Sequence, residues 1–256
     1  MGKADLHIHT TASYDGTATP AATLEYVCAS TDLDVIAITD HDAIDGSLMA
    51  KEMAARYGID VITGIEVSTK DGHLLALFVD QIVPRNLTLQ KTVEYIAEIG
   101  GLCVVPHPGG KWDGSAQEQT IRNVLASNEL RKTLVGIETY NGSLPNLKTN
   151  CHAQEMNREF CLADVGNSDA HILWMIGKGW TTFAGRSASD LRTALVEGTT
   201  RAMNTQRSWR FYPDYLQSQL LRTAGVVRFS KETPGSKILL RWVPGMQTNL
   251  ARQFLW

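Results

Sequence analysis

The feature that most constrains the fold of this chain is a repeated alternation of short β-rich runs with helical patterns. Seven β-rich runs, bounded by turn or helix signals, lie at residues 4–9, 35–39, 61–67, 73–79, 102–106, 135–140 and 163–167. Helices between them begin at recognisable caps such as Thr19, Asp45 and Thr88. Strands that alternate with helices predict βα units. We therefore expect an α/β protein, a distorted seven-stranded (βα)7 TIM-like barrel.

One connection between two of these runs is too short for a helical crossover. Residues 69–72 form a four-residue link between the runs at 61–67 and 73–79, and a link of this length forces a hairpin. We expect one antiparallel pair in an otherwise mainly parallel sheet.

The charge of the chain is distributed unevenly. The net charge is −3, but residues 205–256 carry eight basic side chains against two acidic ones. This segment is also rich in aromatic residues, and about 50 residues alone form only a small hydrophobic core. We expect residues 1–204 to form the barrel and residues 205–256 to be an extension that packs on it or on a second subunit, so an oligomer is one outcome. The basic side chains would bind the acidic barrel, a phosphorylated substrate or an acidic partner such as nucleic acid.

Apolar runs and cysteines indicate the compartment. The longest apolar run, residues 74–79, is far shorter than the roughly 18 residues that span a bilayer. No apolar leader follows Met1, and the four cysteines form no CxxC pair. We expect a cytoplasmic protein with reduced thiols and no membrane contact.

Two strand ends carry pairs of metal-binding residue types. His7 and His9 lie on one face of the first strand, and Asp5 on that face is placed to orient one of them. Asp169 and His171 repeat the spacing after the last run. A carboxylate with an imidazole suits Zn²⁺, Mn²⁺ or Fe²⁺. Each pair alone also has a simpler explanation, a solvated surface histidine or a turn residue.

Five further polar residues lie at comparable places. His41 follows the second run, and His107 ends another. Glu66 lies within an apolar strand, where an unpaired carboxylate is costly, and the hairpin brings His73 opposite residues 66–68. Asp15 follows the first strand and alone would be assigned to a turn. The nine groups outnumber the four or five ligands of one ion, which predicts two or three divalent ions.

These residues lie within motifs that resemble those of the PHP (polymerase and histidinol phosphatase) family. The motifs are DLHIHT (5–10), SYDG (13–16), ITDHD (38–42), GIEV (64–67), HLLALF (73–78), PHP (106–108) and NSDAH (167–171), in the family's order. The resemblance extends from residue 3 to about residue 200, with a closing helix within 179–198. It implies a distorted barrel with a trinuclear metal centre at its mouth.

The resemblance also implies a distribution of the ligands. The first ion would be held by His7, His9, Glu66 and Asp169. Glu66 would bridge to a second ion, held also by His73 and His107. Asp15, His41 and His171 would hold the third ion. Many relatives have His at position 15, so Asp15 here would favour Mn²⁺ or Mg²⁺ at the third ion or would make that ion labile. The lid domain that some nucleotide-hydrolysing relatives carry before the PHP motif is absent from the 40 residues between Glu66 and His107.

The predicted activity is hydrolysis of a phosphate monoester of a small molecule or nucleotide by a metal-bridging hydroxide. Glu66, Asp169 and His171 are the expected catalytic residues. Lys111 would reach a phosphate oxygen, although a solvated lysine explains it equally well. Either Asp40 or Asp42 would protonate the leaving group. The alternatives are a nuclease or oligonucleotide phosphodiesterase that uses the basic segment, and a non-catalytic metal-dependent binding module.

Overall fold

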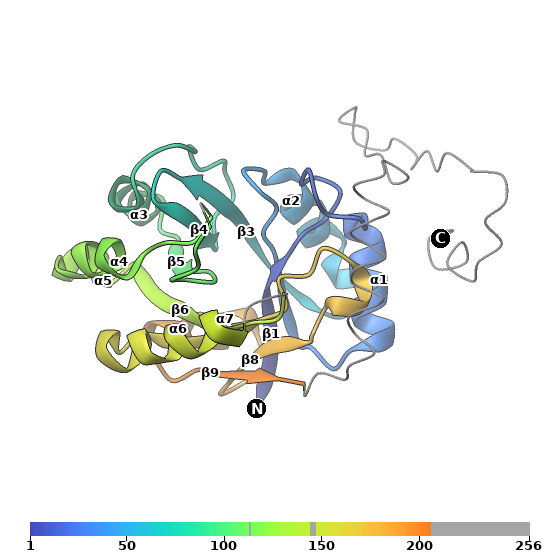
Figure 1. Ribbon diagram of the computed structural model, residues 1–256. Helices are drawn as coiled ribbons and strands as arrows, with labels where there is room; N and C mark the ends of the chain where they lie inside the picture. The colour runs from blue at the N-terminus through green and yellow to red at the C-terminus, as the bar shows by residue number, and fades with distance from the viewer. Residues whose placement is uncertain (113, 144–146, 206–256) are drawn as a thin grey trace, which may run out of the picture. The chain divides into compact units, whose positions relative to one another are not determined.

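The computed structural model describes residues 1–112, 114–143 and 147–205, which belong to one mixed α/β unit. Its strands are β1 (Gly2–Ile8), β2 (Val35–Ile38), β3 (Asp60–Thr69), β4 (Gly72–Leu77), β5 (Leu102–Val105), β6 (Leu134–Asn141), β7 (Ala163–Asn167), β8 (Gly179–Phe183) and β9 (Arg201–Asn204). They form one sheet in the order β7-β6-β5-β4-β3-β2-β1-β8-β9. The sheet curves until β7 contacts β8 and β9, which makes a nearly closed barrel (Figure 1).

The strand count and the strand directions differ from the prediction. All seven predicted runs form strands, but β8 and β9 extend the sheet beyond β1. Four of the eight pairings are antiparallel, so the sheet is not mainly parallel. The reason is that one reversed strand makes two antiparallel pairings, and both β4 and β8 are reversed. The predicted hairpin between β3 and β4 is confirmed.

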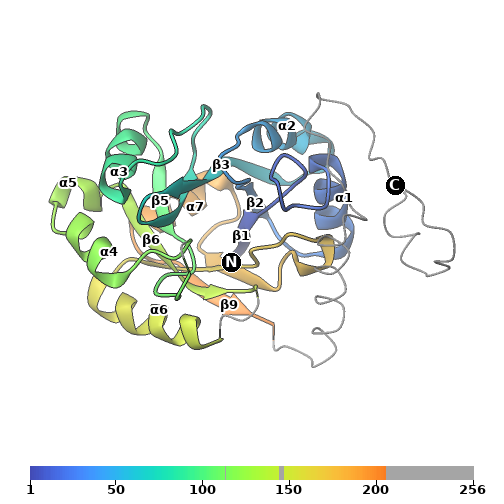
Figure 2. The ribbon, with the colours of Figure 1, turned by 45° about the horizontal axis from the view of Figure 1, so that its top comes forward.

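Helices cover the outside of the sheet. They are α1 (Pro20–Ser30), α2 (Asp45–Met53), α3 (Leu89–Glu98), α4 (Glu118–Leu125), α5 (Asn128–Arg131), α6 (Leu147–Phe160) and α7 (Ala188–Val196), with short 3₁₀ turns at Ala54–Arg56 and Leu173–Met175. Helices α1 and α2 lie beside β1 to β3, and α3 to α6 lie beside β4 to β7 (Figures 1 and 2). The predicted caps Thr19 and Thr88 accept hydrogen bonds from the first turns of their helices. Asp45 is the first residue of α2 rather than its cap.

Helix α7 closes one end of the barrel. It contacts β3, β6, β7 and β8, and its Leu191 and Leu195 belong to an apolar core shared with Leu6 and Val104. The backbone N–H of Ala188 donates to Asp60 at the start of β3, so α7 lies at the amino-terminal ends of the parallel strands. The opposite end, where the parallel strands finish, is left for polar side chains.

Two further predictions concern membrane spans and the C-terminal extension. Among the described residues, no helix is long and apolar enough to cross a membrane. Residues 206–256, which carry the predicted basic and aromatic extension, lie outside them.

Candidate metal centre

The structure brings the nine predicted ligand side chains together at the barrel end opposite α7. Their ligand atoms form four groups within which all atoms lie within 4.8 Å of one another: His9, Asp15, His41 and His171; His7, His9 and Glu66; His7, His107 and Asp169; and His41, Glu66 and His73. They come from β1, β3 and β4 and from the segments that follow β1, β2, β5 and β7. Residues far apart in the chain therefore face one small volume.

Glu66 is the centre of this cluster. Its side chain is buried, and both carboxylate oxygens face imidazole nitrogens. Oε2 lies 3.1 Å from His7 Nε2, 3.2 Å from His9 Nε2 and 3.2 Å from His41 Nδ1, whereas Oε1 lies 2.8 Å from His73 Nδ1 and 3.1 Å from His107 Nε2. One carboxylate is thus shared by five imidazoles.

The charges in the cluster depend on one another. Burial disfavours the charged Glu66 carboxylate, but the charges of His7, His41 and His73 together hold its pKa well below the usual value. Burial likewise opposes a charged His9, but the carboxylates of Asp169 and Glu66, 3.4 and 3.2 Å from its Nε2, raise its pKa to about 10. Without a metal, protons on His7, His9 and His73, whose pKa values are raised, offset the negative charge of the carboxylates. A divalent cation would compete with these protons for the same atoms.

Glu138 supports the deepest part of the cluster. It is fully buried in β6, where Oε1 accepts hydrogen bonds from His7 Nδ1 (2.8 Å) and Asn167 Nδ2 (2.7 Å). Its Oε2 accepts from the backbone N–H of His107 (2.9 Å) and from Asn141 Nδ2 (2.8 Å). Because His7 donates from Nδ1, its Nε2 is the nitrogen that can bind a metal once its proton has left. Glu138 therefore selects the tautomer of His7 that can bind a metal.

Asn141 extends this support to a second carboxylate. Besides Glu138, its amide lies 3.1 Å from Asp169 Oδ2. We call His7, Glu66, His107 and Asp169 the inner group. Sequence reasoning missed Glu138, although it carries the signal that indicated Glu66, a carboxylate within an apolar strand (residues 137–139).

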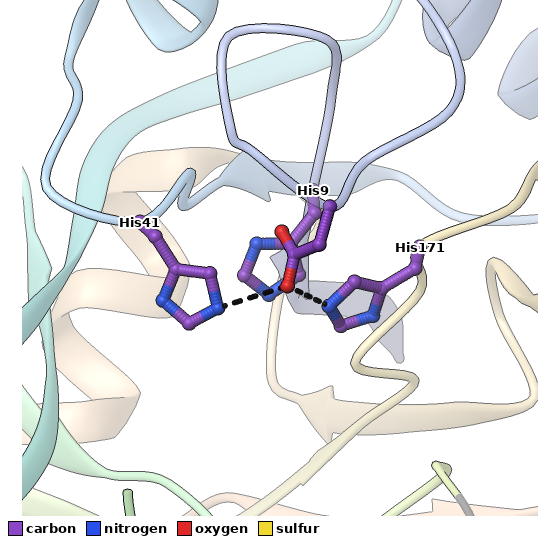
Figure 3. Close-up of side chains that lie close together, drawn as sticks. His9, His41 and His171 are labelled. Carbon is purple, nitrogen blue, oxygen red and sulfur yellow. Dashed lines mark hydrogen bonds and ion pairs between the residues drawn. The ribbon is translucent and has the colours of Figure 1, made fainter. Parts of the chain in front are cut away.

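Asp15, His41 and His171 form what we call the outer group. Asp15 Oδ2 lies 3.1 Å from His171 Nε2 and 3.3 Å from His41 Nε2, and Oδ1 accepts a hydrogen bond from the Ser13 hydroxyl at 2.6 Å. Figure 3 shows the rings of His41 and His171 on two sides of the site, with the ring of His9 between them. Burial opposes the charge of Asp15, but hydrogen bonds with His171 and His41 hold its pKa far below its usual range.

The loop that carries Asp15 is held by the buried carboxylate of Asp40. The two oxygens of Asp40 accept hydrogen bonds from the backbone N–H (2.6 Å) and hydroxyl (2.7 Å) of Thr10. The loop then passes so close to itself that a Cβ on Gly16 would lie 2.0 Å from the Thr10 carbonyl oxygen. Asp42 accepts from the backbone N–H of Ser68 at 2.8 Å. Both acids considered as proton donors thus hold backbone in place.

Asp5 also binds backbone rather than an imidazole. Its carboxylate accepts hydrogen bonds from the N–H groups of Ser168 (3.0 Å) and Gly177 (2.9 Å). Burial raises its pKa to about 6 although these hydrogen bonds oppose the shift. The orienting role predicted for Asp5 belongs to Glu138 at His7, because the Asp5 side chain is occupied by the segment after β7.

The unpaired atoms of the cluster test whether these residues fit a cation. Among the described residues, six buried cluster atoms have no hydrogen-bond partner: His7 Nε2, His9 Nδ1, His9 Nε2, His41 Nδ1, Glu66 Oε2 and His107 Nδ1. Buried polar atoms are normally satisfied, and imidazole and carboxylate are the ligands that Zn²⁺, Mn²⁺ and Fe²⁺ accept. The donor set therefore fits divalent cations.

Comparisons with known proteins relate the chain to one family. The family model described as PHP-associated matches residues 148–200. An uncharacterized protein of Methanocaldococcus jannaschii is 31% identical over 176 residues, which are 62% of this chain and 97% of that protein. A solved two-domain protein from Bacteroides vulgatus, described as containing a PHP-like metal-dependent phosphoesterase, shares the fold with a TM-score of 0.66 at 20% identity, covering 91% of this chain and 72% of that chain.

Shorter matches are to enzymes with named activities. A 3',5'-nucleoside bisphosphate phosphatase of Chromobacterium violaceum is 36% identical over 88 residues, 33% of this chain and 30% of that enzyme. A 5'-3' exoribonuclease of Haemophilus influenzae is 36% identical over 100 residues, 38% of this chain and 36% of that enzyme. Together with the metal-binding donor set at the mouth of the barrel, these matches show that the chain belongs to the PHP family of metal-dependent phosphoesterases.

Proposed function

We propose that this protein hydrolyses a phosphate monoester of a small molecule or nucleotide, using divalent ions held by the nine clustered side chains. The observation that carries the proposal is Glu66, a buried carboxylate shared by five imidazoles, several of whose nitrogens lack hydrogen bonds. The relative that acts on nucleoside bisphosphates supports a phosphorylated small molecule as substrate.

The proposed ligand sets follow the contacts of the side chains. One ion would be held by His7, His9, Glu66 and Asp169, and the distances of His7 and His9 to both carboxylates support this set. Glu66 would bridge to a second ion held by His73 and His107. The outer group would hold a third. We propose Zn²⁺, Mn²⁺ or Fe²⁺, with Mg²⁺ as a further choice beside Asp15.

Bound ions would supply a water of lowered pKa and would offset the charge of the phosphoryl oxygens. The chain's own contribution is to hold the ligand atoms in place. Glu66, Asp169 and His171, the proposed catalytic residues, face the shared volume, and Glu138 keeps His7 in the metal-binding tautomer. Lys111 is exposed in the loop after His107, and we propose that it contacts an outer phosphate oxygen.

A matched substrate panel tests the proposal. The Mn²⁺-loaded protein is assayed with phosphate monoesters and with diesters of the same alcohols, and its metal content is measured by elemental analysis. Release of phosphate from monoesters, lost in a His7→Ala Glu66→Ala double variant, is expected. A metal-loaded protein that cleaves neither class would contradict the proposal. Retained cellular function in the metal-free double variant would favour a non-catalytic binding module.

A nuclease activity is the second candidate. It is favoured by the match to an exoribonuclease and by the basic residues of segment 205–256. Phosphate contacts release counterions, so oligonucleotide binding would weaken steeply with added salt. A flat salt response would count against this candidate. A cytoplasmic location and an oligomeric state stay predictions.

A further inference from the structure

Two exposed aromatic side chains lie beside the proposed metal ligands. Tyr14 is 68% exposed, and its ring stacks on His41 with centroids 5.0 Å apart and an interplanar angle of 20°. Trp112 is 46% exposed, and its ring lies 4.6 Å from His107 and 5.8 Å from His73. Two large rings that meet both solvent and the ligand imidazoles are placed where a bound molecule would touch them.

The position of Trp112 is built into its loop. A Cβ on Gly114 would lie 1.9 Å from Trp112 Cζ3, and a Cβ on Gly110 would lie 2.7 Å from Trp112 Nε1. Both glycines therefore leave the space that the indole fills. The loop is fixed by Ser115, whose hydroxyl accepts from the Gly110 N–H and donates to the His107 carbonyl, each at 2.6 Å. The exposed indole is thus held in place by the loop.

The two aromatic side chains end a row of rings across the cluster. The row runs from Tyr14 through His41 and His73 to Trp112, with neighbouring centroids 5.0, 5.0 and 5.8 Å apart. His41 and His73, in the middle of the row, are ligand candidates that would lie close to a phosphate. Tyr14 and Trp112, at its two ends, offer π faces. A ligand with a phosphate and a planar ring has complementary chemistry, because aromatic rings stack on one another in offset geometry.

We infer that Trp112 binds a planar base of the substrate, so that nucleoside phosphates are preferred over sugar or aliphatic phosphates. This inference rests on the proposed phosphoesterase function, to which it adds the substrate class and the residue that selects it. Stacking of a base on one aromatic side chain is sequence-tolerant, so the preference is for a base of any kind.

A pair of substrates that differ only in the base tests the inference. Adenosine 5'-monophosphate and ribose 5-phosphate carry the same ester, and both are assayed with the wild type and with Trp112→Leu. Trp112→Leu is expected to raise KM for the nucleotide by about tenfold and to leave the constants for ribose 5-phosphate and the metal content unchanged. Trp112→Phe, which keeps a ring, should restore most of the loss. Trp180→Leu is the matched control. The Trp180 ring contacts Lys3 near the start of β1, with Lys3 Nζ 5.3 Å from the ring centroid, and not the ligand residues.

A binding measurement separates this inference from the proposed function. Calorimetry with the metal-loaded protein compares adenosine with ribose, neither of which has an ester to hydrolyse. Tighter binding of adenosine that is lost in Trp112→Leu supports the inference, even if neither phosphate is hydrolysed and the proposed function fails. Equal binding of adenosine and ribose would overturn it. An equal loss of activity on both phosphates in Trp112→Leu would also overturn it, since that result shows positioning of His107 instead.

Discussion

The inner and outer groups of the metal centre use the same kinds of side chain but are supported differently. The inner group is backed by Glu138, whose buried carboxylate fixes His7 and the backbone of His107, and by Asn141, which reaches Asp169. In the outer group, the recorded supporting contacts come from uncharged groups: Asp15 Oδ1 accepts from the hydroxyl of Ser13, and His171 Nδ1 donates to the backbone carbonyl of Asp169 at 3.0 Å. The His171 side chain is also 18% exposed, whereas that of His7 is fully buried.

This difference teaches that ligand type alone does not set the strength of a metal site. Hydrogen-bonded partners behind the ligands fix their orientation and tautomer, and burial excludes competing water. We therefore expect the inner group to keep its ions during purification and the outer group to exchange its ion with the buffer.

Replacement of Glu66 should have the largest effect, because it removes a charge shared by both sides of the comparison. Glu66→Gln keeps the shape of the side chain but leaves five imidazoles without their carboxylate. Removing one partner of a buried charged pair costs about 3–5 kcal/mol. We expect loss of bound metal and a fall in kcat/KM of at least about a hundredfold.

Elemental analysis and steady-state kinetics check this result. Glu155→Gln, a change of the same kind on the exposed face of α6, is the matched control and should behave as the wild type. Full metal content in Glu66→Gln would mean that Glu66 is not a ligand.

Glu138→Gln should rank second and should act on the inner group alone. The amide can present N–H to His7 Nδ1, which would move the proton to Nε2 and block that nitrogen as a ligand. Loss of a partner behind a metal ligand lowers affinity or activity by about 10- to 100-fold. Competition with a chelator measures the inner affinity. A variant that loses the outer ion first would break the proposed division.

Asp15→Asn should rank third, because the outer group is closer to solvent. We expect the loss of one metal equivalent with the inner ions retained, and a fall in activity of about tenfold, the low end of such effects. Asp15→His, which installs the residue expected in many relatives, should keep the equivalent. Anomalous scattering from crystals of each variant would show which ion is missing, and an equal loss of all ions would contradict two separable groups.

The smallest effect is expected from pH on the metal-free protein. His9 has a folded pKa raised to about 10 from 6.5, so its contribution to stability is complete below pH 6.5 and is lost as the pH rises toward 10. The depressed pKa values of Glu66 and Asp169 act oppositely, and their contribution is lost as the pH falls below the ordinary carboxylate range. Asp5, whose pKa is raised to about 6, adds to the decline with rising pH.

Denaturant unfolding at pH 6 and pH 9 measures this effect. The metal-free protein should have the lower free energy of unfolding at pH 9. Mn²⁺ should stabilise the protein more at pH 9 than at pH 6, because the ions then compete with fewer protons. A metal-free protein that is more stable at pH 9 would show that the imidazoles are not protonated in the cluster.

Much of the cluster could be predicted because its members repeat at strand ends. His7 and His9 share a strand face by period two, and the hairpin at 69–72 places His73 opposite Ser68, next to Glu66. These are local rules, and the order of the motifs links the separate segments. The capped helices α1 and α3 followed from equally local signals at Thr19 and Thr88.

Features that depend on distant partners could not be predicted in this way. Strand β8 forms because the chain after β7 reaches the free edge of β1, where Ala4 pairs with Thr181. Glu138 is an isolated acid in a strand until the fold brings His7 and Asn167 to it. Asp40 follows its strand as a ligand would, but its oxygens bind Thr10. Sequence position indicates which polar residues are near the mouth, and only the fold shows which of them support others.

The most direct measurement is anomalous diffraction from crystals soaked in Mn²⁺, with maps on both sides of the manganese absorption edge. Two or three peaks should lie among the nine side chains, with Glu66 touching two of them and neighbouring ions about 3.5–4 Å apart. A map without peaks beside Glu66, or with one ion bound elsewhere on the barrel, would contradict a shared multi-metal centre.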